Sequence, residues 1–188
     1  MLKKIQYNSP VVLTFALVSL AALLAGQFTA GRSTSLLFSV YRAPLDNVFT
    51  WFRFLGHVLG HASYEHYISN MTLLLVIGPP LEERYGGKVL LECMAATALI
   101  SGVVQFLLFP NAALLGASGV VFMMIILSSV SGASQGRIPL TLILVFAIYI
   151  GGELFTGLTQ PDHVSQLTHI IGGTCGAIFG LLLRRGKT

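Results

Sequence analysis

Six segments of this chain are long enough to cross a lipid bilayer as helices, and this feature limits its fold more than any other. A spanning helix needs about 20 mostly apolar residues. Apolar side chains make up 54% of the 188 residues and charged ones only 10%, whereas soluble domains carry roughly 25% charged residues. We therefore expect an all-α polytopic membrane protein, with one domain over 1–188. The six predicted spans are 11–30, 61–80, 89–110, 117–134, 138–157 and 165–183.

The first apolar run, 11–30, admits two interpretations. Lys3 and Lys4 precede it, so it also fits a secretory signal peptide with a basic start and an apolar centre. The run is long for such a peptide, and the later segments need this helix to give an even number of spans. We therefore expect a retained span, with the cleaved signal as the alternative.

The stretch 31–60 mixes four charged residues with large apolar ones. It is too polar to cross a bilayer and too apolar to lie free in water, which predicts an interfacial loop with short amphipathic helices. The following span, 61–80, has a first half that is too polar for lipid. Because Pro79 and Pro80 lack a backbone N–H, we expect that helix to end there.

The distribution of Lys and Arg predicts the orientation. With a cytoplasmic N-terminus, eight of the 11 Lys and Arg residues fall inside and three outside. This bias predicts that 1–10 and 184–188 are cytoplasmic and that 31–60 is the first external loop. The eight are Lys3, Lys4, Arg84, Lys88, Arg137, Arg184, Arg185 and Lys187, against Arg32, Arg42 and Arg53.

Nucleic acid, metal and cofactor partners are not indicated. The net charge is +4, but in a membrane protein the position of the positive residues matters more than their sum. Cys93 and Cys175 lie within apolar runs, so a disulfide framework is not expected. The chain has no zinc spacing of Cys and His and no Gly-rich phosphate loop. The lipid bilayer is the partner that the composition predicts.

Polar side chains at membrane depth are costly, so three clusters of them are candidate functional sites. The first is Gly116-Ala117-Ser118-Gly119, at the start of the fourth predicted span. A small-residue turn that runs into a helix leaves backbone N–H groups that can bind a developing negative charge. Ser118 would then combine a nucleophile with oxyanion donors at Ala117 and Ser118. The plain alternative is a helix start with Ser118 near the N-cap.

The second cluster surrounds His169 in the sixth predicted span. Gly173, Gly176 and Gly180 follow at four, seven and eleven residues, so His169 leads one stripe of the helix. Gly172, Gly176 and Gly180 also form two overlapping G-x-x-x-G steps. Such a stripe lets a neighbouring helix approach closely, which would allow a short Ser hydroxyl to reach the imidazole. The alternatives are a His bonded to a backbone carbonyl, and glycines that serve packing only.

The third cluster is His61, His66 and Asn70, in the polar half of the second predicted span. His66 and Asn70 are four residues apart and share a helix face. Both can donate hydrogen bonds to a tetrahedral oxyanion, and His61 could anchor the adjoining loop or a water. A metal site is the competing interpretation, but the spacing lacks an H-E-x-x-H helix and a third ligand.

Taken in order, these motifs resemble the rhomboid family of intramembrane serine proteases, of the bacterial six-helix type. The resemblance covers about residues 45–183 and rests on the ordered set rather than on any single motif. The motifs are Arg53-x7-His61-x4-His66-x3-Asn70, Glu82-x-Arg84-x-Gly86, Gly116-x-Ser118-Gly119 and His169-x-x-Gly172-Gly173.

The resemblance implies a serine endopeptidase that works inside the membrane. Ser118 would attack the scissile carbonyl, and His169 would take its proton and return it to the leaving amine. His66, Asn70 and the Ser118 backbone N–H would hold the oxyanion.

The resemblance also implies structural roles. Gly116 would let the loop before the serine adopt its turn. The loop 31–60 would be half submerged in the bilayer, with Phe52-Arg53 at its lipid-facing hairpin. Glu82 and Arg84 would be structural partners near the cytoplasmic end of the second span.

One position departs from the family. Three residues after Gly119, many bacterial rhomboids carry a Tyr whose ring packs on the catalytic His, and this chain has Phe122. The ring can still stack on His169, but the hydroxyl is lost. Neither Glu153 nor Asp162 has a spacing that argues for a triad, so we expect a Ser–His dyad.

The expected substrates are single-pass transmembrane proteins in the inner membrane of a bacterium, cut from a site open to the external side. The sequence specifies neither the physiological substrate nor the oligomeric state. The alternative from another class is an inactive rhomboid-like scaffold or quality-control binding protein, which would be expected to lose the Ser or the His. A small transporter is a third interpretation, but no inverted repeats are visible.

Overall fold

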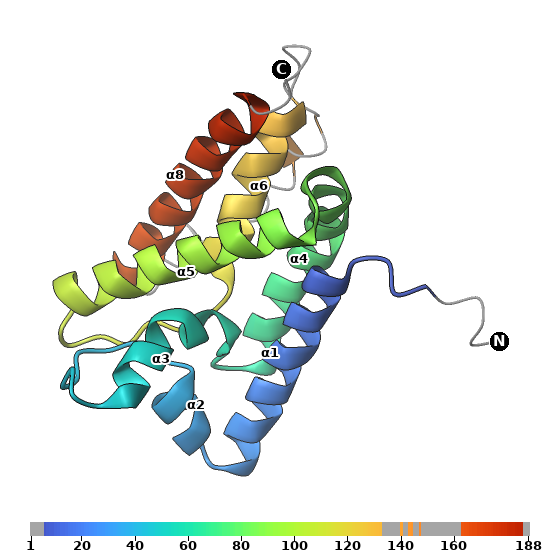
Figure 1. The fold of residues 1–188 in the computed structure, drawn as a ribbon. Coiled ribbons are helices and arrows are strands. Elements are labelled where there is room, and N and C mark those ends of the chain that lie inside the picture. Colours follow the sequence, from blue (N-terminus) through green and yellow to red (C-terminus); the bar gives the residue numbers. More distant parts are fainter. Residues whose placement is uncertain (1–5, 133–139, 141–142, 145–146, 148–162, 186–188) are drawn as a thin grey trace.

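The computed structural model describes residues 6–132, 140, 143–144, 147 and 163–185 (Figure 1). This described part is all-helical, as predicted, and its β contact is an isolated antiparallel bridge between Val40 and Leu114. The fifth predicted span, 138–157, lies largely outside it. The helices are α1 (Pro10–Phe28), α2 (Arg32–Leu37), α3 (Val48–Gly56), the 3-10 helix η2 (His57–Leu59), α4 (Tyr64–Tyr85), α5 (Gly87–Leu108), α6 (Ser118–Gly132) and α8 (His163–Arg185).

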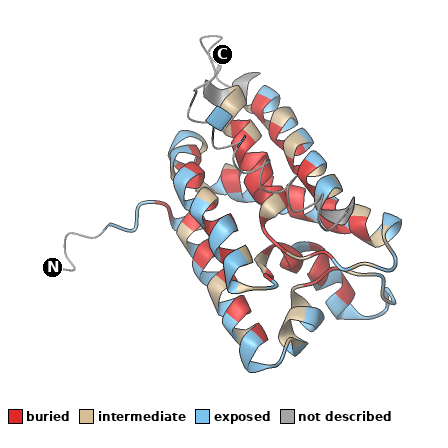
Figure 2. Ribbon diagram, turned by 180° about the vertical axis from the view of Figure 1, so that it is seen from behind, coloured by how far each residue is buried: buried red, intermediate tan, exposed pale blue. Residues whose placement is uncertain are grey.

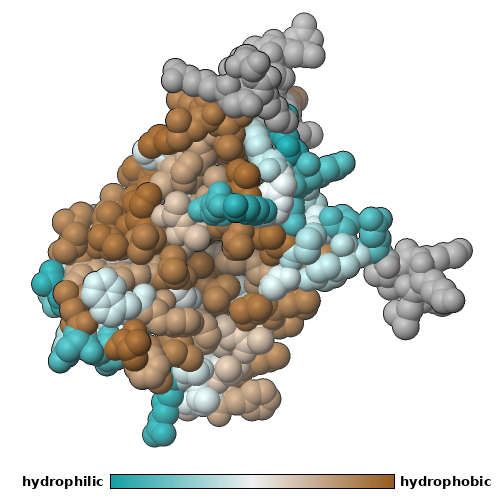
Figure 3. Space-filling view, in the orientation of Figure 1, coloured by the Kyte–Doolittle hydropathy of each residue, from teal (hydrophilic) through white to brown (hydrophobic). Residues whose placement is uncertain are grey.

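Within this described part, three helices are long and apolar enough to cross a membrane: α1, α5 and the Gln166–Leu183 part of α8. The predicted second span is helical, but the polar first half and charged last turn of α4 lower its hydropathy. The described part of α6 is apolar but has only 15 residues. Apolar side chains cover most of the visible faces of α5 and α8 (Figure 3), as lipid contact requires. Six spans therefore stay a prediction.

Helix α6 is the centre of the packing. Its residues from Val120 to Ile125 are each at most 3% exposed, so the helix is enclosed on all sides (Figure 2). A helix that is apolar around its whole circumference belongs in an interior. Helix α8 lies alongside it and makes the most extensive helix contact in the described part (Figure 1). The first turn of α6, which begins at Ser118, is therefore held by its neighbours.

Glycines let α8 approach α6. A Cβ on Gly172 would collide with the carbonyl oxygen of Gly119, and one on Gly176 with that of Met123. A Cβ on Gly180 would come within 2.7 Å of the Val130 side chain. The predicted small-residue stripe is confirmed for these three. The expected place of Gly173 on the stripe is wrong, since a Cβ added to it would be in ordinary contact, 3.7 Å from the nearest side-chain atom.

The predicted end of this helix at Pro79-Pro80 is wrong, because α4 continues to Tyr85. The two prolines remove only two N–H donors from the helix. The preceding residue is Gly78, which has no Cβ to clash with the Pro79 ring. Gly78 also lies tightly against Val12 of α1, where a Cβ would come within 2.6 Å of a side-chain methyl. Helix α4 therefore packs against α1 directly before its two prolines.

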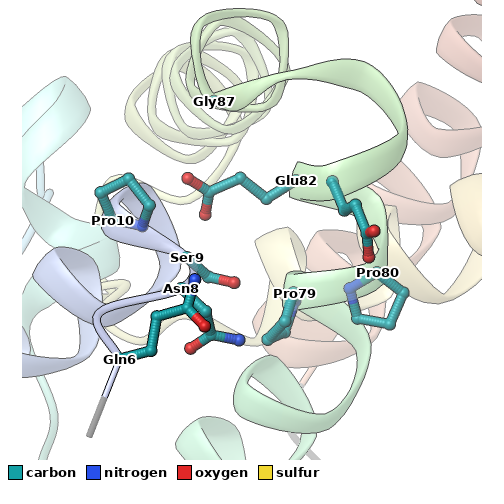
Figure 4. A pocket seen from close by; sticks show the side chains of 9 residues that line it. Gln6, Asn8, Ser9, Pro10, Pro79, Pro80, Glu82 and Gly87 are labelled. Carbon is teal, nitrogen blue, oxygen red and sulfur yellow. The ribbon is translucent and has the colours of Figure 1, made fainter. Parts of the chain in front are cut away.

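Glu82 ties the last turn of α4 to the start of α1. Its carboxylate is 6% exposed and accepts hydrogen bonds from the backbone N–H groups of Val11 and Val12, at 2.9 and 3.0 Å. Figure 4 shows this carboxylate pointing toward the start of α1. A carboxylate is well suited to the free N–H groups and positive dipole end of a helix. The predicted partnership with Arg84 is wrong, because Arg84 is exposed and its guanidinium lies over the Tyr85 ring.

The stretch 31–60 contains short helices, as predicted. The expected lipid-facing position of Arg53 is wrong: the side chain is 1% exposed and lies within α3. Its guanidinium lies 4.2 Å from the centre of the Tyr41 ring and donates to the hydroxyls of Tyr41 and Thr50. Neighbouring Phe52 is 49% exposed, since successive residues of a helix point to different faces.

Candidate active site

The chain just before α6 is held by backbone contacts from two other segments. Val40 and Leu114 exchange both of their backbone hydrogen bonds, each 2.9 Å long. Gly116 then donates its N–H to the carbonyl oxygen of His57, also at 2.9 Å. These contacts fix the path of the chain into Ser118, the first residue of α6.

Gly116 has a backbone conformation that favours glycine, with φ at +127°. A Cβ at this position would also come within 2.8 Å of Cε1 and 2.9 Å of Nε2 of His66. Glycine is therefore favoured here for two reasons: the turn needs a positive φ, and the His66 imidazole leaves no room for a Cβ. The arrangement agrees with the turn expected here, and it puts His66 against the residue two before Ser118.

The start of α6 provides backbone N–H groups. Ala117 is fully buried, and its carbonyl oxygen accepts from the N–H of Val121 at 2.9 Å, so the helical ladder begins here. The N–H groups in the first turn of a helix have no partner in that ladder. Ser118 is half-buried, and its own N–H belongs to this first turn.

His169 of α8 faces the first turns of α6. Its ring stacks on Phe122, with ring centres 4.2 Å apart and planes 9° from parallel, as predicted for the aromatic residue at this position. Phe122 is four residues after Ser118 and therefore shares its helix face. The adjacent Thr168 touches Gly119, where a Cβ would lie 2.9 Å from its methyl group. The fold thus brings the His169 turn against the turn that begins with Ser118.

The third cluster lies at and before the start of α4. Asn70 is 1% exposed and donates from Nδ2 to the carbonyl oxygen of His66 at 2.9 Å. The rings of His61 and His66 meet edge to face, with centres 5.1 Å apart. Among the residues that the structure describes, no group of three or more His, Cys, Asp or Glu could hold a metal ion. His66 thus lies against the loop before α6, and His169 lies against Phe122 within α6.

The family model of the Rhomboid domain matches residues 48–186, most of the chain. The chain belongs to the rhomboid family. This assignment confirms the family resemblance drawn from the motifs, while the bacterial six-helix type stays a prediction. The match contains all three polar clusters.

Curated relatives of this rhomboid come from distant organisms. Rhomboid-like protein 11, chloroplastic, from Arabidopsis thaliana is 23% identical over 97% of this chain and 69% of its own length. Rhomboid-related protein 2 from Mus musculus is 29% identical over 68% of this chain and 46% of its own length. Rhomboid-like protease 3 from Toxoplasma gondii is 28% identical over 53% of this chain and 38% of its own length. This rhomboid thus spans less than half of the last two.

Sequence reasoning missed His57, which is completely buried in η2. Its Nε2 lies 3.0 Å from the carbonyl oxygen of Ala98, and its own carbonyl oxygen holds Gly116. Burial lowers the pKa of the His57 side chain to about 4, so the imidazole is neutral at pH 7. A signal was available: Arg53, His57 and His61 recur every four residues in an otherwise apolar stretch.

Proposed function

We propose that this rhomboid is an intramembrane serine endopeptidase in which Ser118 is the nucleophile and His169 its general base. The observation that carries this proposal is the contact of the His169 turn with the first turn of α6, through the Phe122 stack and the Gly119–Gly172 approach. A Ser hydroxyl is a weak nucleophile until an adjacent imidazole activates it.

The proposed reaction has two halves. The Ser118 oxygen attacks the carbonyl carbon of the scissile bond while its proton passes to His169. The tetrahedral intermediate then expels the amine, which takes that proton, and an ester on Ser118 remains. A water deprotonated by His169 hydrolyses the ester, and the proton returns to the serine oxygen. The pair acts as a dyad, without an acid partner.

The developing oxyanion would be held by donors from two helices. The backbone N–H groups at Ala117 and Ser118 supply one set, and the side chains of His66 and Asn70 supply the other. The position of His66 against Gly116 supports this, since Gly116 lies in the turn that presents those N–H groups. Removal of one such donor typically lowers kcat by about 10²–10³-fold.

The proposed substrates are single-pass transmembrane proteins. They must present extended backbone to Ser118, because the amides of an intact helix are already bonded internally. The name of the Toxoplasma relative, a rhomboid-like protease, supports proteolysis as the activity. The Lys and Arg bias supports both termini in the cytoplasm and a site open to the external side. The proposed location is the inner membrane of a bacterium, crossed by six spans.

Cleavage of a model transmembrane substrate by the purified protein in detergent tests this proposal. Wild type should cleave it, and Ser118→Ala and His169→Ala should each abolish cleavage with the melting temperature unchanged. Full activity of Ser118→Ala would exclude the dyad. Binding of the substrate by wild type without cleavage would favour the non-proteolytic scaffold instead.

A further inference from the structure

A small apolar cluster supports the loop 109–117, which joins α5 to the first residue of α6, Ser118. The buried members of this cluster are Val40, Phe54 and Leu114, and Phe106, Phe109 and Ala112 pack against them. They come from the stretch 31–60, from α5 and from the loop itself. The main core, which contains α6, forms a separate cluster. The path of the loop therefore depends on contacts outside the main core.

Arg42 lies at this cluster and binds the end of α5. Its Nε donates to the carbonyl oxygen of Phe106 and its Nη2 to that of Leu107, both at 3.1 Å. Carbonyl groups in the last turn of a helix have no partner within the helix, and the residue four after Phe106 is Pro110, which has no N–H to donate. The positive guanidinium also suits the negative end of the helix dipole.

The guanidinium of Arg42 has a second contact with the same helix turn. Its central carbon lies 5.4 Å from the centre of the Phe106 ring, within the range of a cation–π interaction. Phe106 in turn packs against the small cluster, with its ring centre 5.4 Å from that of Phe54. Arg42 is thus fixed to α5 by two hydrogen bonds and a ring contact.

The segment 40–42 connects the end of α5 to the middle of the loop. Arg42 binds the end of the helix, and Val40, two residues earlier, exchanges both backbone hydrogen bonds with Leu114. Leu114 is four residues before Ser118. We propose that Arg42 is a positioning residue: by fixing 40–42 on α5, it fixes the Val40–Leu114 bridge and, through it, the turn that presents Ser118.

The expected effect on catalysis is partial. Displacements of about 1 Å in a catalytic group can cost roughly 10²-fold in rate. The bond from the Gly116 N–H to the carbonyl oxygen of His57 does not involve Arg42, so it still holds the loop when Arg42 is replaced. The loop would shift rather than detach, and only part of that loss should appear. The catalytic part of this inference rests on the proposed function.

Substitutions of Arg42 test the inference in the cleavage assay. Arg42→Ala should lower kcat at least five-fold and change KM less than two-fold, and Arg42→Lys, which keeps a positive donor, should give a kcat between those of Arg42→Ala and wild type. Arg32→Ala is the matched control, since Arg32 is another exposed Arg of the stretch 31–60, and it should keep the wild-type kcat. Equal kcat values for Arg42→Ala and Arg32→Ala, a loss confined to KM, or no recovery in Arg42→Lys would overturn the inference.

Hydrogen exchange followed by mass spectrometry tests the structural step without any substrate. In Arg42→Ala, peptides that contain the N–H groups of Val40 and Leu114 should exchange at least ten-fold faster than in wild type, whereas peptides of α1 should be unchanged. Unchanged exchange at Val40 and Leu114 would overturn the inference. Equal acceleration in α1 would overturn it too, because Arg42 would then stabilise the fold as a whole. Wild type that cleaves nothing would contradict the proposed function and leave the exchange result standing.

Discussion

Gly116 connects the loop before α6 with His57 and His66. Its N–H bonds to the carbonyl oxygen of His57, and its Cα faces the ring of His66. The serine two residues later begins α6. A single small residue thus connects the loop segment, α4 and the turn that carries the proposed nucleophile.

We expect Gly116→Ala to impair both stability and catalysis. A non-glycine residue at φ of +127° is strained by about 1–3 kcal/mol, and the new Cβ would displace His66. Cleavage assays should show kcat lowered at least ten-fold, and the melting temperature should fall. Gly31→Ala is the matched control, since Gly31 also has a positive φ, of 84°, but open space around it. Equal kcat values for the two variants would contradict this account of Gly116.

His57 predicts a pH dependence of stability. Its pKa is about 4 in the folded protein and 6.5 ordinarily, because burial disfavours the charged ring. The unfolded chain therefore binds a proton that the folded protein does not, and stability falls as pH drops from 6.5 to about 4. Relative to His57→Gln, wild type should lose up to about 3 kcal/mol over this range and nothing above it. Thermal unfolding in detergent checks this, and a constant difference between the two proteins would count against it.

The residue types and spacing of the candidate site were predictable, but their partners were not. Ser118, His169 and Phe122 follow from short motifs at the ends and faces of expected helices. His57 escaped notice because its partners, Ala98 and Gly116, lie more than 40 residues away in the chain. Only the packed structure brings such groups together.

At the scale of elements, the contact between α6 and α8 depends on glycines at particular positions. Gly172→Ala would put a methyl group on the carbonyl oxygen of Gly119 and force the helices apart. Gly173→Ala places its methyl in ordinary contact, 3.7 Å from the nearest side-chain atom. We expect Gly172→Ala to lower kcat at least ten-fold and the melting temperature by several degrees. Gly173→Ala should resemble wild type in both measurements, and equal losses in the two variants would refute the stripe.

The carboxylate of Glu82 holds α1 and α4 together. Glu82→Gln removes the charge from two hydrogen bonds and leaves one amide nitrogen facing a backbone donor. Hydrogen bonds to charged groups contribute about 1.5–3 kcal/mol, so the free energy of unfolding should fall by about that amount. Glu83→Gln, at the neighbouring exposed position, should change it by less than about 0.5 kcal/mol. Equal stabilities of the two variants in chemical denaturation would contradict this assignment.

The sequence pattern predicted which segments form helices better than it predicted where a helix ends. The apolar runs of α1, α5 and α8 are clear in the sequence, and the bounds of these helices differ from the predicted spans by few residues. The predicted end of α4 was wrong because Pro79-Pro80 usually end a helix, whereas here α4 packs against α1 and continues. The Glu82–Arg84 partnership was wrong for the same reason, since the carboxylate binds another helix.

At the scale of the whole molecule, the face shown in Figure 3 is largely apolar, whereas several polar side chains are buried in the fold. The exposed faces of α5 and α8 suit lipid, while His61, Asn70 and His169 are buried within the helices. Polar side chains at membrane depth are costly and are kept where they serve a function. The arrangement suits a hydrolytic site shielded from lipid.

Labelling with a serine-directed fluorophosphonate probe tests the central claim most directly, because it reads the reactivity of Ser118 without a known substrate. Wild type should be labelled on Ser118. Ser118→Ala should show no labelling, and His169→Ala should be labelled at least 10²-fold more slowly, with melting temperatures equal to wild type. Labelling that persists in Ser118→Ala, or that is unchanged in His169→Ala, would contradict the proposed dyad.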